Sequence, residues 1–244
     1  MATAIEIDGS PADNERLAER VAAEHVQFID LLARNGRVHC LTERLAWLTE
    51  EVETALSAQP DGALIRSALD RFLTDEPESG PIRVELYRCP DSSFRTLIRQ
   101  RDGANPPAVL HLRRSVDLVN QTGPLQQAPV PKGEAVVMCS ASGLVLGSSR
   151  GPIGLISGSR IVWAEHVSAL RAVRHLKNAL AAQQIATVTL PIREDELALF
   201  DAAFIVHADG ISAVEGMADR ALDVDHALLG DIRRAWEAAG WERP

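Results

Sequence analysis

Residues 143–178 read GLVLGSSRGPIGLISGSRIVWAEHVSALRAVRHLKN, and this stretch decides the fold. The apolar run 153–156 has the composition of a strand, and Gly158-Ser159 is a two-residue hairpin turn before a return strand over 160–163. Ser168 then caps a helix, whose apolar positions recur at helical spacing: Leu170, Val173, Leu176 and Leu180. A hairpin that leads into a helix start gathers backbone N–H groups, and such a place commonly holds an anion.

The sequence on either side predicts further strands and helices. A strand over 26–33 and a return strand over 38–41 flank the turn Asn35-Gly36, and Thr42 caps a helix that runs through Leu56. More strands are expected at 82–87, 94–98, 109–112, 135–138, 185–190 and 202–207. More helices are expected at 14–21 and 63–73, with a turn and short helix at 192–197 and a last helix capped by Asp225. The pattern predicts an α/β protein.

Composition excludes several classes of protein. The 244 residues are 46% hydrophobic and 24% charged, which is typical of globular proteins. The net charge is −9 and the basic residues are scattered, which argues against nucleic acid and anionic membranes as partners. No apolar run is long enough to span a bilayer, and no signal peptide is visible, so a cytoplasmic location is expected. The three cysteines lack metal-ligand spacing and are expected to be reduced thiols.

The stretch 143–178 resembles the core of the class IV aminotransferases, the fold-type-IV enzymes that use pyridoxal phosphate (PLP). These include branched-chain and D-amino-acid aminotransferases and aminodeoxychorismate lyase. Their framework is the pattern G-x-V-x-E-G-x-x-x-N-I, then a hairpin, a short loop and G-[IV]-T at a helix start. Six residues fit this framework without a gap: Gly143, Val145, Ile153, Gly158, Val162 and Trp163. Arg44-Leu45 also resembles the R-L of the family's H-x-x-R-L helix start, and the resemblance covers roughly residues 28–241 in order.

The resemblance implies two domains and a homodimer. The N-terminal α/β sandwich is expected over 1–113, an interdomain linker over 114–131, and a C-terminal pseudo-barrel over 132–244. The family's ligand site lies in the cleft between the two domains.

The positions that carry the family's chemistry do not match. Gly147 stands where the family has the glutamate that keeps the PLP pyridine nitrogen protonated, and Pro152 stands where it has asparagine. Val167-Ser168-Ala169 replaces the G-[IV]-T of the first phosphate turn, and Val206-His207-Ala208 replaces the T-N-S of the second. The resemblance therefore predicts a weakened phosphate cup and no partner for the ring nitrogen.

The lysine that forms the Schiff base is also missing from its expected place. One alignment puts Val119 or Asn120 there, and counting back from Gly147 puts the position nearer Arg114. Lys132, in a turn-like segment, is the only lysine nearby and matters only if PLP is used. Lys177, the other lysine of the chain, lies in the predicted helix.

These losses together predict that the chain uses no cofactor, with PLP as the alternative. Arg44, Ser168 and His207 would converge near the vacated phosphate position and bind a carboxylate or phosphate. Each has another interpretation: Arg44 as a solvated helix-start residue, Ser168 as a helix cap only, and His207 as a packed residue.

Three functions remain open from the sequence. The first is cofactor-independent chemistry on, or binding of, a small anionic molecule in the interdomain cleft. The second is a pseudoenzyme that acts as a protein partner. The third is a PLP-dependent aminotransferase or lyase with a relocated lysine. No metal site is predicted, and whether the chain is an enzyme is left undecided.

Overall fold

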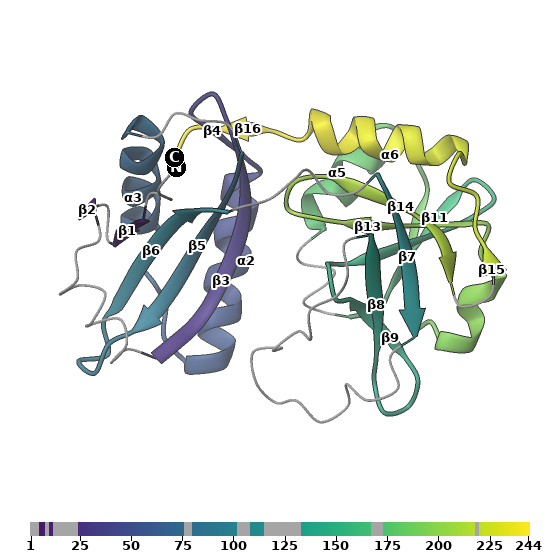
Figure 1. The fold of residues 1–244 in the computed structure, drawn as a ribbon, viewed down its shortest axis with the longest axis horizontal. Helices are drawn as coiled ribbons and strands as arrows, with labels where there is room; N and C mark the ends of the chain where they lie inside the picture. The colour runs from purple at the N-terminus through teal and green to yellow at the C-terminus, as the bar shows by residue number, and fades with distance from the viewer. Residues whose placement is uncertain are drawn as a thin grey trace. The chain divides into compact units, whose positions relative to one another are not determined.

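The structure is a computed structural model, and it describes residues 5–7, 10–11, 24–75, 80–101, 108–114, 133–166, 173–217 and 220–244. These residues form two compact units, one of Met1–Gly103 with Gly240–Pro244 and one of Ala104–Ala239 (Figure 1). The mixed α/β fold with two parts is confirmed. No helix in the described part of the chain has the length and apolar character needed to cross a membrane.

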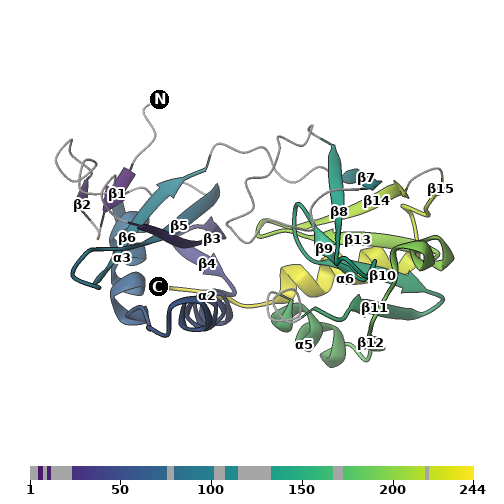
Figure 2. The same cartoon turned by 90° about the horizontal axis from the view of Figure 1, so that it is seen from below.

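In its described residues, the first unit is an antiparallel sheet with two helices on one face. The described strands follow the order β16-β4-β3-β5-β6-β1-β2, with bounds β16 Trp241–Glu242, β4 Arg37–His39, β3 Glu24–Arg34, β5 Gly80–Arg88, β6 Phe94–Gln100, β1 Ile5–Ile7 and β2 Ser10–Pro11. Helices α2 (Leu41–Leu56) and α3 (Gly62–Asp75) pack on the sheet (Figure 2). Alternate strand residues face the helices and form one core, among them Ile29, Leu31, Ile82, Val84 and Leu86.

The second unit is a sheet that curls toward a barrel. Its strands follow the order β12-β11-β10-β13-β14-β7-β8-β9, with β15 beside β14. The bounds are β12 Thr187–Leu190, β11 Arg160–Ala164, β10 Ile153–Ser157, β13 Ala202–Val206, β14 Ile211–Met217, β7 Val109–Arg114, β8 Glu134–Cys139, β9 Val145–Ser148 and β15 Arg220–Ala221. The Val145 N–H donates to the Ile192 carbonyl at 2.8 Å. Because Ile192 follows β12, this bond joins the two ends of the sheet and confirms the pseudo-barrel.

The hairpin expected at the centre of the sequence is present. Strands β10 and β11 pair antiparallel, with Ser157 opposite Arg160, and Gly158 takes the positive φ of 56° that the tight turn needs. The Asp201 carboxylate accepts the Gly158 N–H at 2.7 Å, which fixes the turn from the neighbouring strand. The described helices of this unit are α5 (Arg174–Ala182), α6 (Ala227–Ala238) and the short helix η1 (Glu194–Leu199).

Two helix starts differ from the sequence-based expectation, and a third lies outside the described residues. Helix α2 begins at Leu41, and its N-cap is Cys40, in a left-handed conformation and without a side-chain cap. Helix α6 is capped by His226, whose Nδ1 accepts the Leu228 N–H at 3.3 Å, in place of Asp225. Helix α5 begins at Arg174, and the cap expected at Ser168 lies outside the described residues, as does the helix expected at 14–21.

The division of the chain differs from the expected domain boundaries at two points. Strand β7 pairs parallel with both β14 and β8, so it belongs to the second sheet although most of it precedes residue 114. Strand β16 pairs with β4 through Trp241 opposite His39, so the residues after α6 return to the first sheet. The pairing partners, which lie far away in the sequence, determine both assignments.

Candidate functional site

Arg44 lies in the first turn of α2. Its backbone N–H donates to the Cys40 carbonyl at 3.0 Å, which is the bond that closes this turn. The side chain is half-buried, and one guanidinium nitrogen has no exposed surface. Arg44 also favours the charged form of the nearby Cys40 thiol, but burial dominates and raises the pKa of Cys40 to about 12. A half-buried cation therefore lies in the first turn of the helix, close to a helix start that favours negative charge.

His207 follows strand β13 and lies in a turn of the second unit. Its backbone N–H donates to the Gly210 carbonyl at 2.8 Å, and its side chain is half-buried with Nε2 enclosed. The preceding residue, Val206, donates its N–H to the Pro152 carbonyl at 3.0 Å. This bond brings the His207 turn to the tight turn that connects β9 with β10.

Gly147, where the sequence resemblance places the family's glutamate, borders the same tight turn. A Cβ on Gly147 would lie 3.7 Å from the Gly151 carbonyl oxygen and 3.8 Å from the Met138 methyl. A Cβ on Gly151 would in turn lie 2.2 Å from the Val206 carbonyl oxygen, so this turn has room only for glycine. Gly147 itself has a φ of 151°, which L residues rarely adopt.

The other predicted positions are only partly described. Ser168, Val119, Asn120 and Lys132 lie outside the described residues, and Arg114 is the last residue of β7. Lys177 lies on α5, where its Nζ donates to the Thr189 hydroxyl at 3.1 Å. Arg44 belongs to the first unit and His207 to the second. The convergence of Arg44, Ser168 and His207 therefore stays a prediction.

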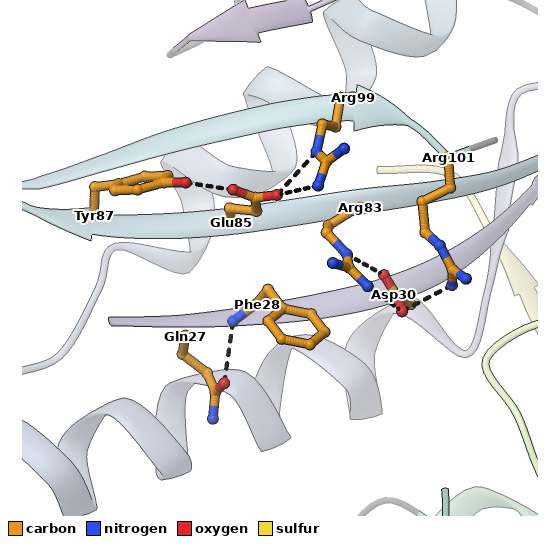
Figure 3. A network of polar contacts seen from close by, with 8 residues as sticks. All are labelled: Gln27, Phe28, Asp30, Arg83, Glu85, Tyr87, Arg99 and Arg101. Atoms are coloured by element: carbon orange, nitrogen blue, oxygen red, sulfur yellow. Dashed lines mark hydrogen bonds and ion pairs between the residues drawn. The ribbon is translucent and has the colours of Figure 1, made fainter. Parts of the chain in front are cut away.

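A polar network that the sequence analysis did not identify lies on the face of the first sheet that points away from α2 and α3 (Figure 3). The Asp30 carboxylate accepts two bonds from Arg83, at 2.7 Å from Nε and 2.9 Å from a terminal nitrogen, and one from Arg101 at 2.8 Å. The Glu85 carboxylate accepts from Arg99 at 2.9 Å and 2.8 Å and from the Tyr87 hydroxyl. The sequence did contain a signal for this network. Charged residues alternate with apolar ones within 82–87, and side chains two residues apart in a strand lie on the same face of the sheet.

The charges of this network are unequal. Arg83 and Arg99 stand directly opposite each other on β5 and β6, an arrangement that is destabilising without counter-charges. Asp30 supplies one, and its hydrogen bond raises the pKa of Arg83 against the opposing effect of burial. Three guanidinium groups share two carboxylates, so the network carries one net positive charge. The side chains of Arg99 and Arg101 are 37% and 33% exposed, so solutes can reach them.

Arg83 has a further contact that fixes its plane. Its guanidinium carbon lies 4.0 Å from the centre of the Phe28 ring on β3. Stacking on the ring and bidentate pairing with Asp30 leave this side chain little freedom. Arg83 therefore serves as the fixed part of the network, whereas Arg99 and Arg101 lie at its more exposed side.

Comparison with known proteins relates the fold to one group of enzymes. No family model and no curated protein sequence matches the chain. The solved structure of a fold IV-transaminase from Curtobacterium pusillum matches with a TM-score of 0.74 and 15% identity, over 93% of this chain and 90% of that one. A hypothetical aminotransferase from Mycobacterium tuberculosis, in its α-ketoglutarate- and PMP-bound form, matches with a TM-score of 0.73 and 14% identity, over 98% of both chains.

A third structure extends this group to a lyase. The 4-amino-4-deoxychorismate lyase from Pseudomonas aeruginosa matches with a TM-score of 0.69 and 17% identity, over 94% of this chain and 97% of that one. These likenesses confirm that the chain has the aminotransferase- and lyase-like fold of type IV that the sequence resemblance implied.

The comparisons also correct one expectation. The sequence analysis predicted no cofactor, but neighbours with this fold hold PLP, PMP or a phosphopyridoxyl group, which points to PLP and not to the absence of a cofactor. The described residues fit such a group only in part. Arg44 is a suitable cation for its phosphate, but Gly147 offers no carboxylate, and the one described lysine, Lys177, is bonded to Thr189.

Proposed function

We propose that this chain binds PLP, or a phosphorylated or carboxylate molecule of similar size, and that Arg44, Ser168 and His207 hold its anionic group. The observation that carries the proposal is the likeness over 98% of both chains to an aminotransferase that holds PMP and α-ketoglutarate. That neighbour binds a phosphate group and a dicarboxylate together. A cation in the first turn of α2 supports the same chemistry in this chain, because a guanidinium suits a phosphate.

The exposed side of the arginine network is a second candidate binding site for an anionic group. Within the described part of the chain, Arg101 donates to Asp30 through one terminal nitrogen, and Arg99 directs two of its nitrogens to a single oxygen of Glu85. Each therefore keeps N–H groups that can bind a carboxylate, which guanidinium groups recognise with two parallel bonds. We propose that Arg99 and Arg101 bind the carboxylate of a small molecule.

Covalent chemistry with PLP would depend on Lys132. When bound through a lysine, PLP supplies an electron sink. Lys177 already donates to Thr189, so Lys132 is the amine to test. The proposal is therefore binding first, with aminotransferase or lyase chemistry only where Lys132 forms the link. The homodimer implied by the resemblance stays a prediction that the mass in solution can test.

Binding titrations with the full chain test this proposal. We expect saturable binding of PLP that inorganic phosphate competes for, and binding roughly 10- to 100-fold weaker in Arg44→Gln, as expected from the loss of a charged hydrogen bond of about 1.5–3 kcal/mol. Arg233→Gln, an exposed arginine on α6, is the matched control and should bind like the unchanged chain. Absence of saturable binding of PLP, phosphate and α-ketoglutarate would overturn the proposal.

Trapping then separates covalent from non-covalent binding. Borohydride reduction followed by mass spectrometry should place any PLP adduct on Lys132, and Lys132→Ala should abolish the adduct while Lys177→Ala keeps it. An unmodified chain that still binds PLP supports the binding function alone. An adduct on Lys177 would contradict the assignment of the amine.

A further inference from the structure

The start of helix α2 lacks the cap that such helices normally have. Its N-cap residue Cys40 has a φ of 52° and gives no side-chain cap. An N-cap side chain normally accepts the N–H of the second or third helical residue, and its loss destabilises a helix. Here the N–H of Thr42, the second residue of the helix, donates to the Glu242 carboxylate at 3.1 Å, although the two residues are 200 positions apart.

Glu242 makes a second bond at the same helix start. The Thr42 hydroxyl donates to the other carboxylate oxygen of Glu242, and the Arg66 guanidinium on α3 donates to that hydroxyl at 2.9 Å. The negative charge of Glu242 also stands where the dipole of α2 is positive, which stabilises the helix further. Glu242 therefore takes the place of the missing cap.

The strand that carries Glu242 is anchored by its other residues. Strand β16 pairs with β4, and the Gly240 carbonyl accepts the Cys40 N–H at 2.9 Å. The Trp241 ring lies 5.2 Å from the His39 ring in an edge contact and 4.8 Å from the Arg34 guanidinium carbon. These contacts hold the segment Gly240–Pro244 on the first unit, directly after a helix that belongs to the second.

We propose that the segment Gly240–Pro244 is a strap and that Glu242 is the positioning residue that orders the α2 start and with it Arg44. Arg44 follows Thr42 by two residues, in the same helical turn. When the strap detaches, this turn loses its cap, and the Cys40 backbone loses its partner. The effect on ligand affinity rests on the proposed function of Arg44, whereas the ordering of the turn does not.

Cys40 gives a direct readout of the strap. Its side chain is 2% exposed, and the charge of Glu242 is one of the influences that raise its pKa. We expect Glu242→Ala to accelerate alkylation of Cys40 and amide hydrogen exchange at residues 42–44 by about 2- to 30-fold, the range expected from loss of an N-cap. Arg243→Gln, an exposed residue of the same segment, should change neither rate.

The same variants test the link to ligand binding. Glu242→Ala should weaken PLP binding, and combining it with Arg44→Gln should add little, because both changes act through one side chain. If hydrogen exchange accelerates in Glu242→Ala while Arg44→Gln leaves PLP binding unchanged, the strap is supported and the proposed ligand site is contradicted. Unchanged alkylation and exchange in Glu242→Ala, or equal acceleration in Arg243→Gln, would overturn the strap.

Discussion

At the scale of single residues, the close approach of Gly154 to Phe204 makes glycine necessary in β10. A Cβ on Gly154 would lie 2.2 Å from the Phe204 ring, which is fully buried and packs edge-on against Trp163 at 5.4 Å. Gly154→Ala should therefore lower the free energy of unfolding by about 1–3 kcal/mol through overpacking, measured by urea denaturation. Gly230→Ala in helix α6 should instead raise it by about 0.5–1 kcal/mol. Equal effects of the two changes would contradict the packing.

Cys40 predicts a dependence of stability on pH. Burial raises the pKa of Cys40 to about 12 from the ordinary value of 9.0, so between these values the folded state keeps a proton that the unfolded state loses. The free energy of unfolding should be insensitive to Cys40 below about pH 9 and should fall as pH rises from there toward 12. Urea denaturation of Cys40→Ala should show a weaker fall, and an identical pH profile would contradict this account.

At the scale of elements, the two strands of the central hairpin could be predicted because their signals are local. A continuous apolar run, β-branched residues and Gly158 all lie within a few residues of one another. The start of α2 could not be predicted in the same way, because Glu242 caps it from 200 residues away. The polar face of the first sheet was missed for a related reason: Asp30 pairs with Arg83, which is 53 residues distant. A single sequence does not state which strands are neighbours.

A substitution at Asp30 tests how much the polar network contributes to the stability of the first sheet. Asp30→Asn would leave Arg83 and Arg101 without their carboxylate, on strands where Arg83 already faces Arg99. We expect the free energy of unfolding to fall by about 1–3 kcal/mol, as for a charged hydrogen bond that is largely shielded from water. Asp231→Asn, which breaks an exposed pair with Arg234 on α6, should cost less than about 0.5 kcal/mol. Equal losses would show that the network contributes nothing beyond a surface pair.

At the scale of the whole molecule, the sequence predicted the fold but not the whole site. Framework positions such as Gly143 and Trp163 indicated a type IV fold, because the backbone geometry they support does not depend on the cofactor chemistry. The same sequence led to the wrong expectation about the cofactor, because losses at Gly147 and near Arg114 were taken as loss of the ligand itself. An anion can still bind where a cation such as Arg44 remains, even after the groups for covalent chemistry have changed.

A crystal structure of the chain grown with PLP tests the central claim most directly. The account predicts that the phosphate lies within hydrogen-bond distance of the Arg44 guanidinium, with Ser168 and His207 as further donors. A phosphate bound elsewhere with Arg44 turned away, or a crystal saturated with PLP that shows no bound ligand, would contradict it.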